Sequence, residues 1–190
     1  MIDLFWLFLI YSFLGFLLET SFAKATRAKK QNRKCRIFFP ICPVYGFGAL
    51  ILTSLPSLIQ QDIFLLFCFG FITASTIEYL TGILYGHLFH VSFWDYRGMP
   101  YHVQGQICLP FSVGWGMLGV ILICGLHPAI TPLVLKIPRN WFLPAFYGFL
   151  ADTTLTFCIL KKTKDPNTLK WYSFIREQIT NPYSHHISAK

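Results

Sequence analysis

Three carboxylic acids, Glu19, Glu78 and Asp152, lie within long apolar stretches of this chain. A carboxylate at the centre of a membrane helix is unfavourable by roughly 2.5–3.5 kcal/mol, which selects for protonation, pairing or contact with water. Small residues accompany each acid at helical spacing, so these faces are expected to pack against protein rather than lipid. The pattern predicts an acid-lined cavity that opens to the cytosol. The alternative is that neutral carboxyl groups only hydrogen-bond neighbouring helices.

A second feature is the block from Trp94 to Gly116, in which aromatic residues, glycines and prolines separate two apolar stretches. Pro110 suits the first turn of a helix, because its missing N–H would have no partner there. We therefore expect a structured cytosolic loop that re-enters the membrane edge and then begins a transmembrane helix. Asp95 could equally serve to cap the turn that follows it. Besides the three acids, the residues predicted to line the cavity are Trp94, Asp95, Tyr96, Ser112, Trp115 and Tyr45.

Several glycines are expected to be structural, because glycine permits tight turns and the close approach of helices. Gly82 and Gly86 form a GxxxG pair, for which helix packing is the expected role. The full predicted set is Gly46, Gly48, Gly82, Gly86, Gly105, Gly114 and Gly116.

The composition is that of a membrane protein. Of the 190 residues, 54% are hydrophobic and 13% are charged, whereas a soluble domain carries about 25% charged residues. We predict an all-α integral membrane protein with five transmembrane helices in a single domain, residues 1–160, and a basic cytosolic tail, 161–190, with an interfacial helix. The six cysteines have neither CxxC nor zinc-type spacing, so no metal or cofactor is predicted. The expected spans are residues 4–22, 41–59, 63–88, 109–126 and 141–160, with an external loop at 127–140.

The placement of basic residues predicts the orientation. Of 16 Lys and Arg residues, all but Lys136 and Arg139 fall on one side of this topology. The positive-inside rule makes that side cytosolic, with the N-terminus outside and the C-terminus inside. Topology and anionic lipid thus account for the net charge of +8, so the expected partners are lipids of the cell membrane and not nucleic acid. No Lys or Arg lies within a predicted span, so no basic partner is expected beside the acids.

Two pairs of segments indicate an internal repeat. Cys42–Leu50 resembles Cys108–Leu118, since both run from Cys through Pro to Gly-aromatic-Gly, and Gly15–Ser21 resembles Gly148–Thr154. The matching helices point the same way, so spans 1–2 and 3–4 would form a parallel repeat, with span 5 echoing span 1. Chance similarity between apolar segments is the alternative.

The same blocks resemble a known family, the CmpB-like integral membrane proteins, which are described as type IV ABC-transporter components. The resemblance covers Leu4 to Gly119, and it implies a multi-pass membrane fold with a role in transport. Relatives often carry Asn-Gly-basic where this chain has Gln104-Gly105-Gln106, so a charge-dependent role is not expected there. The matching residues are Gly15, Glu19, Pro43–Gly48, Glu78, Trp94-Asp95-Tyr96, Gly105, Cys108-Leu109, Ser112 and Trp115-Gly116.

Three functions follow from these features. The leading one is a transport-associated, ABC permease-like component, which would need a separate ATPase because the chain has no GxxxxGK[ST] phosphate loop. Five spans are few for a complete transporter, so a homodimer is also expected. The alternatives are a small intramembrane enzyme or binding protein that acts on lipid or isoprenoid headgroups, and a structural or regulatory subunit. The chain has no HExxH motif or other nucleophile or metal motif, and the sequence leaves enzymatic activity open.

Overall fold

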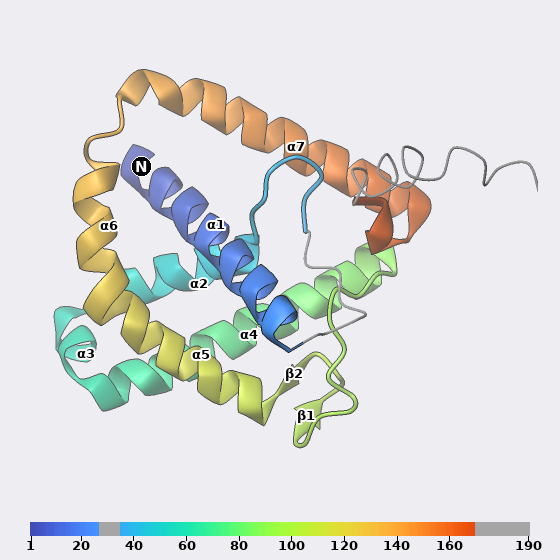
Figure 1. The fold of residues 1–190 in the computed structure, drawn as a ribbon, viewed down its shortest axis with the longest axis horizontal. Helices are drawn as coiled ribbons and strands as arrows, with labels where there is room; N and C mark the ends of the chain where they lie inside the picture. The colour runs from blue at the N-terminus through green and yellow to red at the C-terminus, as the bar shows by residue number, and fades with distance from the viewer. Residues whose placement is uncertain (27–34, 170–190) are drawn as a thin grey trace, which may run out of the picture.

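The computed structural model describes residues 1–26 and 35–169, and its regular structure is helical except for one two-stranded hairpin (Figure 1). This confirms the all-α prediction. The predicted tail helix and most of the basic run after the first span lie outside the described residues. The elements are α1 (Ile2–Ala25), α2 (Pro43–Thr53), α3 (Ser57–Gln61), α4 (Ile63–Phe89), β1 (His102–Val103), β2 (Ile107–Cys108), α5 (Leu109–Ile121), the π-helical turn η1 (Leu122–Leu126), α6 (His127–Val134), the 3₁₀ turn η2 (Arg139–Trp141), α7 (Phe142–Thr163) and the 3₁₀ turn η3 (Pro166–Leu169).

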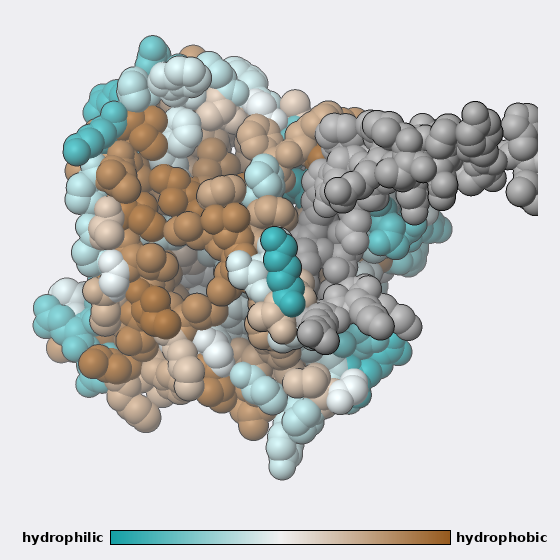
Figure 2. Space-filling model, viewed as in Figure 1, coloured by the Kyte–Doolittle hydropathy of each residue, from teal (hydrophilic) through white to brown (hydrophobic). Residues whose placement is uncertain are grey.

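Among the described residues, four helical segments are long and apolar enough to cross a membrane. They have 24 to 27 residues each, and about 20 suffice to cross the hydrocarbon core. Figure 2 shows apolar residues over the middle of the molecule and hydrophilic residues mainly at its edges, as expected for a membrane protein. The four segments are Ile2–Ala25, Ile63–Phe89, Leu109–Val134 and Arg139–Thr163.

The segment predicted as one span at 41–59 is divided in the structure. Helix α2 has only 11 residues, which is about 16 Å of helix against a hydrocarbon core of about 30 Å. The helix ends at Thr53, and Pro56 then precedes the short α3. Proline disfavours a helical conformation in the residue before it, which explains the break. The five-span topology therefore stays a prediction.

The predicted external loop at 127–140 also differs, because its first half is helix α6, which continues α5 through the π-helical turn η1. Pro128 occupies the first turn of α6, where its missing N–H costs nothing. Pro132 lies inside α6, which has only eight residues. The span that the sequence places at 109–126 thus belongs to a longer helical segment, Leu109–Val134.

Helices α4 and α5 approach closely at glycines. A methyl group added at Gly119 would lie 3.1 Å from the Cα atom of Gly70, and one added at Gly116 would lie 2.6 Å from the ring of Phe67. Of the predicted structural glycines, Gly46, Gly82, Gly105 and Gly116 make close contacts of this kind, whereas Gly48, Gly86 and Gly114 have open space or ordinary contact. Gly70 and Gly119 are close contacts that the sequence did not single out, and Gly15, which matches the family pattern, is a close contact outside the predicted structural set.

We expect Gly116→Leu to destabilise the protein by about 1–3 kcal/mol, because a larger side chain there overpacks the contact with Phe67. Gly125, near the far end of the same helical segment, has nothing within 4 Å of an added methyl group. Gly125→Leu is therefore the matched control, and its melting temperature should stay close to that of the wild type. Equal melting temperatures for the two variants would mean that the α4–α5 contact is not tightly packed.

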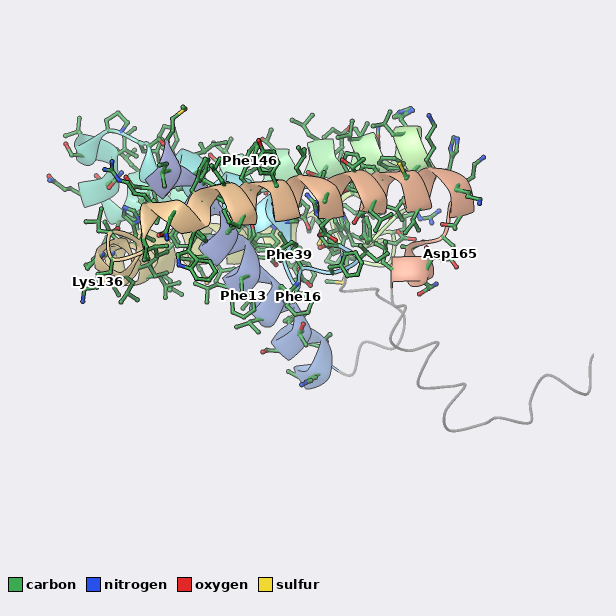
Figure 3. The ribbon with its side chains drawn as sticks, turned by 90° about the horizontal axis from the view of Figure 1, so that it is seen from above. Phe13, Phe16, Phe39, Lys136, Phe146 and Asp165 are labelled. Atoms are coloured by element: carbon green, nitrogen blue, oxygen red, sulfur yellow. The ribbon has the colours of Figure 1, made fainter. Side chains whose placement is uncertain are left out.

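Helix α7 runs across the length of the molecule in Figure 3. In Figure 3, Lys136 lies near the start of α7 and Asp165 lies just beyond its other end. Helix α1 crosses close to α7, and its half that bears Phe13 and Phe16 projects away from α7. Phe39 lies between these two helices, in the segment that leads to α2.

Candidate functional site

Glu78 is the most enclosed acid of the candidate site. It lies on α4 with only 4% of its surface exposed, and both of its carboxylate oxygens accept hydrogen bonds. The hydroxyl of Tyr96 donates to Oε1 at 2.8 Å, and the indole N–H of Trp115 on α5 donates to Oε2 at 2.8 Å. Glu78 thus joins α4 to α5 and to the loop that precedes β1.

The loop between α4 and β1 holds Tyr96 in place. The backbone N–H of Tyr96 donates to the carbonyl of Gly105 at 2.9 Å, and its ring stacks on Phe111 with centroids 4.9 Å apart. Gly105 has a φ of +72°, a conformation that favours glycine. Burial and the neighbouring Glu78 raise the pKa of Tyr96 far above its usual range, so its hydroxyl keeps the proton that it donates.

Glu19 is the second acid, and an aromatic residue also contacts it. The hydroxyl of Tyr45 on α2 donates to Oε1 of Glu19 at 2.6 Å. The ring of Tyr45 meets the ring of Trp115 edge-on, with centroids 5.3 Å apart. Gly15, one turn before Glu19, makes room for Tyr45, since a methyl group there would lie 2.2 Å from the ring. The two acids are thereby connected through Tyr45 and Trp115.

A cavity of about 40 Å³ lies between these groups. A water molecule needs roughly 10–15 Å³ of such space, so the cavity is large enough for a few waters. Cys35, Cys42, Val44 and Phe93 complete its walls. The structure thus brings together six of the nine predicted cavity residues, namely Glu19, Tyr45, Glu78, Trp94, Tyr96 and Trp115.

An apolar groove of about 450 Å³ adjoins the cavity. The two share Val44, Tyr45 and Trp115 as walls. Side chains of α1, α2, α5 and η1, with Ala74 of α4, line the rest of the groove, and nearly all of them are apolar. Sequence reasoning missed this groove, because it depends on how the helices pack.

Asp95 and Ser112 do not line the cavity. Asp95 is exposed, pairs with Arg97 at 2.7 Å and accepts a hydrogen bond from the Arg97 backbone N–H. The Arg97 side chain lowers the pKa of Asp95 by hydrogen bonding. This geometry matches the turn-capping alternative.

Ser112 is buried and accepts a hydrogen bond from Ser75 at 2.7 Å, so it joins α5 to α4.

Asp152 also differs from the prediction, because it lies on α7, apart from the cavity. It is 2% exposed, and its Oδ1 accepts a hydrogen bond from the backbone N–H of Phe38 at 2.8 Å. Arg36 lies beside it, 4% exposed, donating to Thr153 and interacting electrostatically with Asp152. The expectation that no basic residue accompanies the acids is therefore wrong for Asp152. The physical reason is that Arg36, at the end of a basic run, is buried against α7.

Two cavity residues that the sequence did not identify are Cys35 and Cys42. Their sulfur atoms lie 3.1 Å apart, and neither residue forms a disulfide. They lie at the two ends of the segment 35–42, which packs on Asp152. Their spacing of seven residues in the sequence does not indicate that these two cysteines, and not the others, line the cavity. In the described ranges, no group of three or more His, Cys, Asp or Glu residues could hold a metal ion.

Comparison with known proteins gives one informative result. A family model described as "Putative ABC-transporter type IV" matches residues 6–162, which is most of the chain. No curated protein and no solved structure matches it.

Proposed function

The chain belongs to this type IV ABC-transporter family, and we propose that it is the membrane-embedded component of an ABC-type transporter, with an acid-lined cavity that faces the cytosol. The observation that carries the proposal is the meeting of Glu19 and Glu78 in one cavity. A carboxylate reached by water keeps part of its hydration, which lowers the cost of holding it inside a membrane protein. Two acids in one small cavity are therefore better explained by water access than by two separate packing roles.

We propose five crossings, with the N-terminus outside and the C-terminus inside the cell membrane. The four long helices supply four of them. The second would be made by the segment 35–42, which is buried at Arg36 and Ile37, together with the short α2. Irregular backbone next to a short helix lines binding sites in many transporters. The positive-inside rule supports the orientation, since the Trp94 loop and the tail then share the basic side.

The contacts at the two acids support a parallel repeat of α1–α2 and α4–α5. In each pair, the acid of the first helix accepts a hydrogen bond from an aromatic residue that directly precedes a close-packed glycine of the second helix. Tyr45 donates to Glu19 and precedes Gly46, and Trp115 donates to Glu78 and precedes Gly116. These donors are offset by two residues from the sequence match, in which Phe47 aligns with Trp115, so the contacts support a similar pairing of helices and not that exact register. The repeat would therefore place the cavity between its two halves.

The energy for transport would come from a separate ATPase chain, because this sequence has no phosphate-binding loop of the GxxxxGK[ST] type. We further propose that two copies of the chain assemble, since five crossings are few for a complete permease. Surrounding lipids would contact the many exposed apolar side chains of α7.

This role predicts an ATPase in the native complex. When the tagged chain is purified in mild detergent from the membranes of its own cell, the preparation should hydrolyse ATP well above a mock purification with an unrelated tagged membrane protein. Intact chain that consistently carries no ATP hydrolysis above the mock level would contradict the ABC-type role.

A further inference from the structure

Cys35 and Cys42 place two thiol groups side by side in the wall of the small cavity. Their sulfur atoms lie 3.1 Å apart, and no disulfide joins them. The sulfur atoms of a disulfide are about 2 Å apart, so a movement of about 1 Å would bring this pair to bonding distance. The pair therefore meets the first requirement of a reversible disulfide, which is that the two sulfur atoms are already in contact.

The surroundings of the pair are those of reactive cysteines, which typically lie beside a positive charge and are partly exposed. Arg36, which is 4% exposed, interacts electrostatically with both cysteines. Cys35 is half-buried, whereas Cys42 is only 4% exposed. Cys35 is thus the more accessible of the two, and Cys42 is positioned to react with it.

The cavity has room for a small oxidant. Its volume is about 40 Å³, and a water molecule needs roughly 10–15 Å³ of such space. Hydrogen peroxide has two oxygen atoms and fits a space that holds a few waters. Because Cys35 lines this cavity, peroxide inside it would meet the Cys35 sulfur directly.

We propose that Cys35 and Cys42 are a redox modification site, which peroxide converts into a disulfide. In the first step, the Cys35 sulfur attacks one oxygen of hydrogen peroxide and the O–O bond breaks, which gives a sulfenic acid on Cys35 and one water. In the second step, the Cys42 sulfur attacks the Cys35 sulfur, the S–S bond forms and the S–O bond breaks. The departing hydroxide takes the Cys42 proton and leaves as a second water.

The electrons balance, because the two thiols lose two electrons and hydrogen peroxide gains them. The second step uses the existing contact between the two sulfur atoms, so it does not require Cys42 to be without other contacts. A dithiol would reverse the reaction by thiol–disulfide exchange. In a reducing cytosol the disulfide would therefore be transient, as is usual for redox-sensing pairs.

The disulfide would close a ring over the segment 35–42, which connects two parts of the fold. The backbone N–H of Phe38 donates to Asp152 on α7 at 2.8 Å, and the backbone N–H of Cys42 donates to the carbonyl of Ser12 on α1 at 2.8 Å. Oxidation would fix this part of the cavity wall between the two helices, and reduction would release it. The inference goes beyond the proposed function, since the disulfide can form whether or not the chain takes part in transport.

The test counts the cysteines that an alkylating reagent modifies, read by mass spectrometry on the purified full-length chain in nanodiscs. When thiols are blocked at once in the native membranes, all six cysteines should be alkylated. After brief treatment with hydrogen peroxide we expect two fewer, and dithiothreitol should restore them. Because trypsin cuts after Arg36, the unreduced digest should contain the dipeptide Cys35-Arg36 linked to the peptide that begins at Ile37.

Three serine variants identify the site and the order of the steps. Cys42→Ser should form no linked peptide and should keep the sulfenic acid on Cys35, where dimedone traps it. Cys35→Ser should give neither the linked peptide nor a dimedone adduct on Cys42. Cys124→Ser, on the η1 turn, is the matched control and should form the linked peptide as the wild type does.

Hydrogen exchange tests the structural consequence. Backbone amides of residues 37–41 should exchange more slowly in the oxidised than in the reduced wild type, because the ring restricts local opening of this segment. Peroxide-treated Cys35→Ser should show no such slowing. Unchanged exchange in the oxidised wild type would contradict the fixing of the cavity wall.

Three results would overturn the redox site itself. The first is a wild-type chain that keeps six alkylated cysteines after peroxide treatment, and the second is a loss of cysteines without the link between Cys35 and Cys42. The third is a link that is already complete in native membranes, which would make the disulfide a permanent part of the fold. Failure here is distinct from failure of the proposed function, because ATP hydrolysis by the native complex is measured independently of these thiols.

Discussion

Replacing Asp152 with alanine is expected to destabilise the protein by about 1–3 kcal/mol, the usual cost of leaving a buried donor without its acceptor. The variant would leave Arg36 buried without its neighbouring carboxylate and the N–H of Phe38 without its acceptor. Because these contacts hold the segment 35–42 against α7, we expect the loss to loosen the entry to α2 as well.

The comparison of variants separates charge from hydrogen bonding. Asp152→Asn keeps an acceptor for Phe38 but removes the charge, so its melting temperature should fall between those of Asp152→Ala and the wild type. Asp95→Asn is the exposed control, because surface ion pairs contribute only about 0–1 kcal/mol. If Asp152→Ala has the same melting temperature as Asp95→Asn, the interaction of Asp152 with Arg36 contributes nothing to stability.

The second large effect is expected at Glu78. Glu78→Leu removes the acceptor of both the Tyr96 hydroxyl and the Trp115 indole N–H, and each buried donor left unpaired costs about 1–3 kcal/mol. The variant should therefore melt well below the wild type. Glu78→Gln keeps one acceptor oxygen and should lose roughly half as much, while it removes the charge completely.

Glu19→Leu is the matched comparison for Glu78→Leu. Glu19 is half-buried, and the Tyr45 hydroxyl that donates to it lies beside the cavity. Water can therefore replace the lost acceptor, so Glu19→Leu should destabilise the protein less than Glu78→Leu does. Equal losses at the two positions would argue that the cavity is dry.

The sequence predicted the long helices well, because a run of apolar residues is the main requirement for crossing a membrane. It also predicted the meeting of Glu19 and Glu78, since the small residues beside each acid indicate which helix face packs inward. It misplaced the end of the helix that begins at Leu109, because prolines in a helix's first turn look the same in sequence as prolines in a loop.

The environment of Asp152 could not be predicted in the same way. Arg36 continues a basic run, and hydropathy assigns such a run to the cytosolic surface. Its burial depends on the segment 35–42 folding back against α7, a tertiary contact with no local sequence signal. The proximity of Cys35 and Cys42 has the same origin. The turn at Asp95, in contrast, could be predicted from the sequence. An aspartate that accepts a hydrogen bond from a backbone N–H two residues later is a local pattern that needs no tertiary contact.

The measurement that tests the shared, cytosol-facing cavity most directly is thiol labelling of single-cysteine variants, made after the six natural cysteines are replaced. Glu19→Cys and Glu78→Cys would be exposed to a small, membrane-impermeant thiol reagent from the cytosolic side. Gly98→Cys serves as the exposed cytosolic control, Gln61→Cys as the control for the outside, and Thr156→Cys, with a side chain that is fully buried, as the silent control.

We expect Glu19→Cys, Glu78→Cys and Gly98→Cys to react from the cytosolic side, and Gln61→Cys to react only from the outside. Folded Glu19→Cys and Glu78→Cys proteins that stay as silent as Thr156→Cys, while Gly98→Cys reacts, would contradict the cavity. These acids would then be hydrogen-bonding groups in a dry interior.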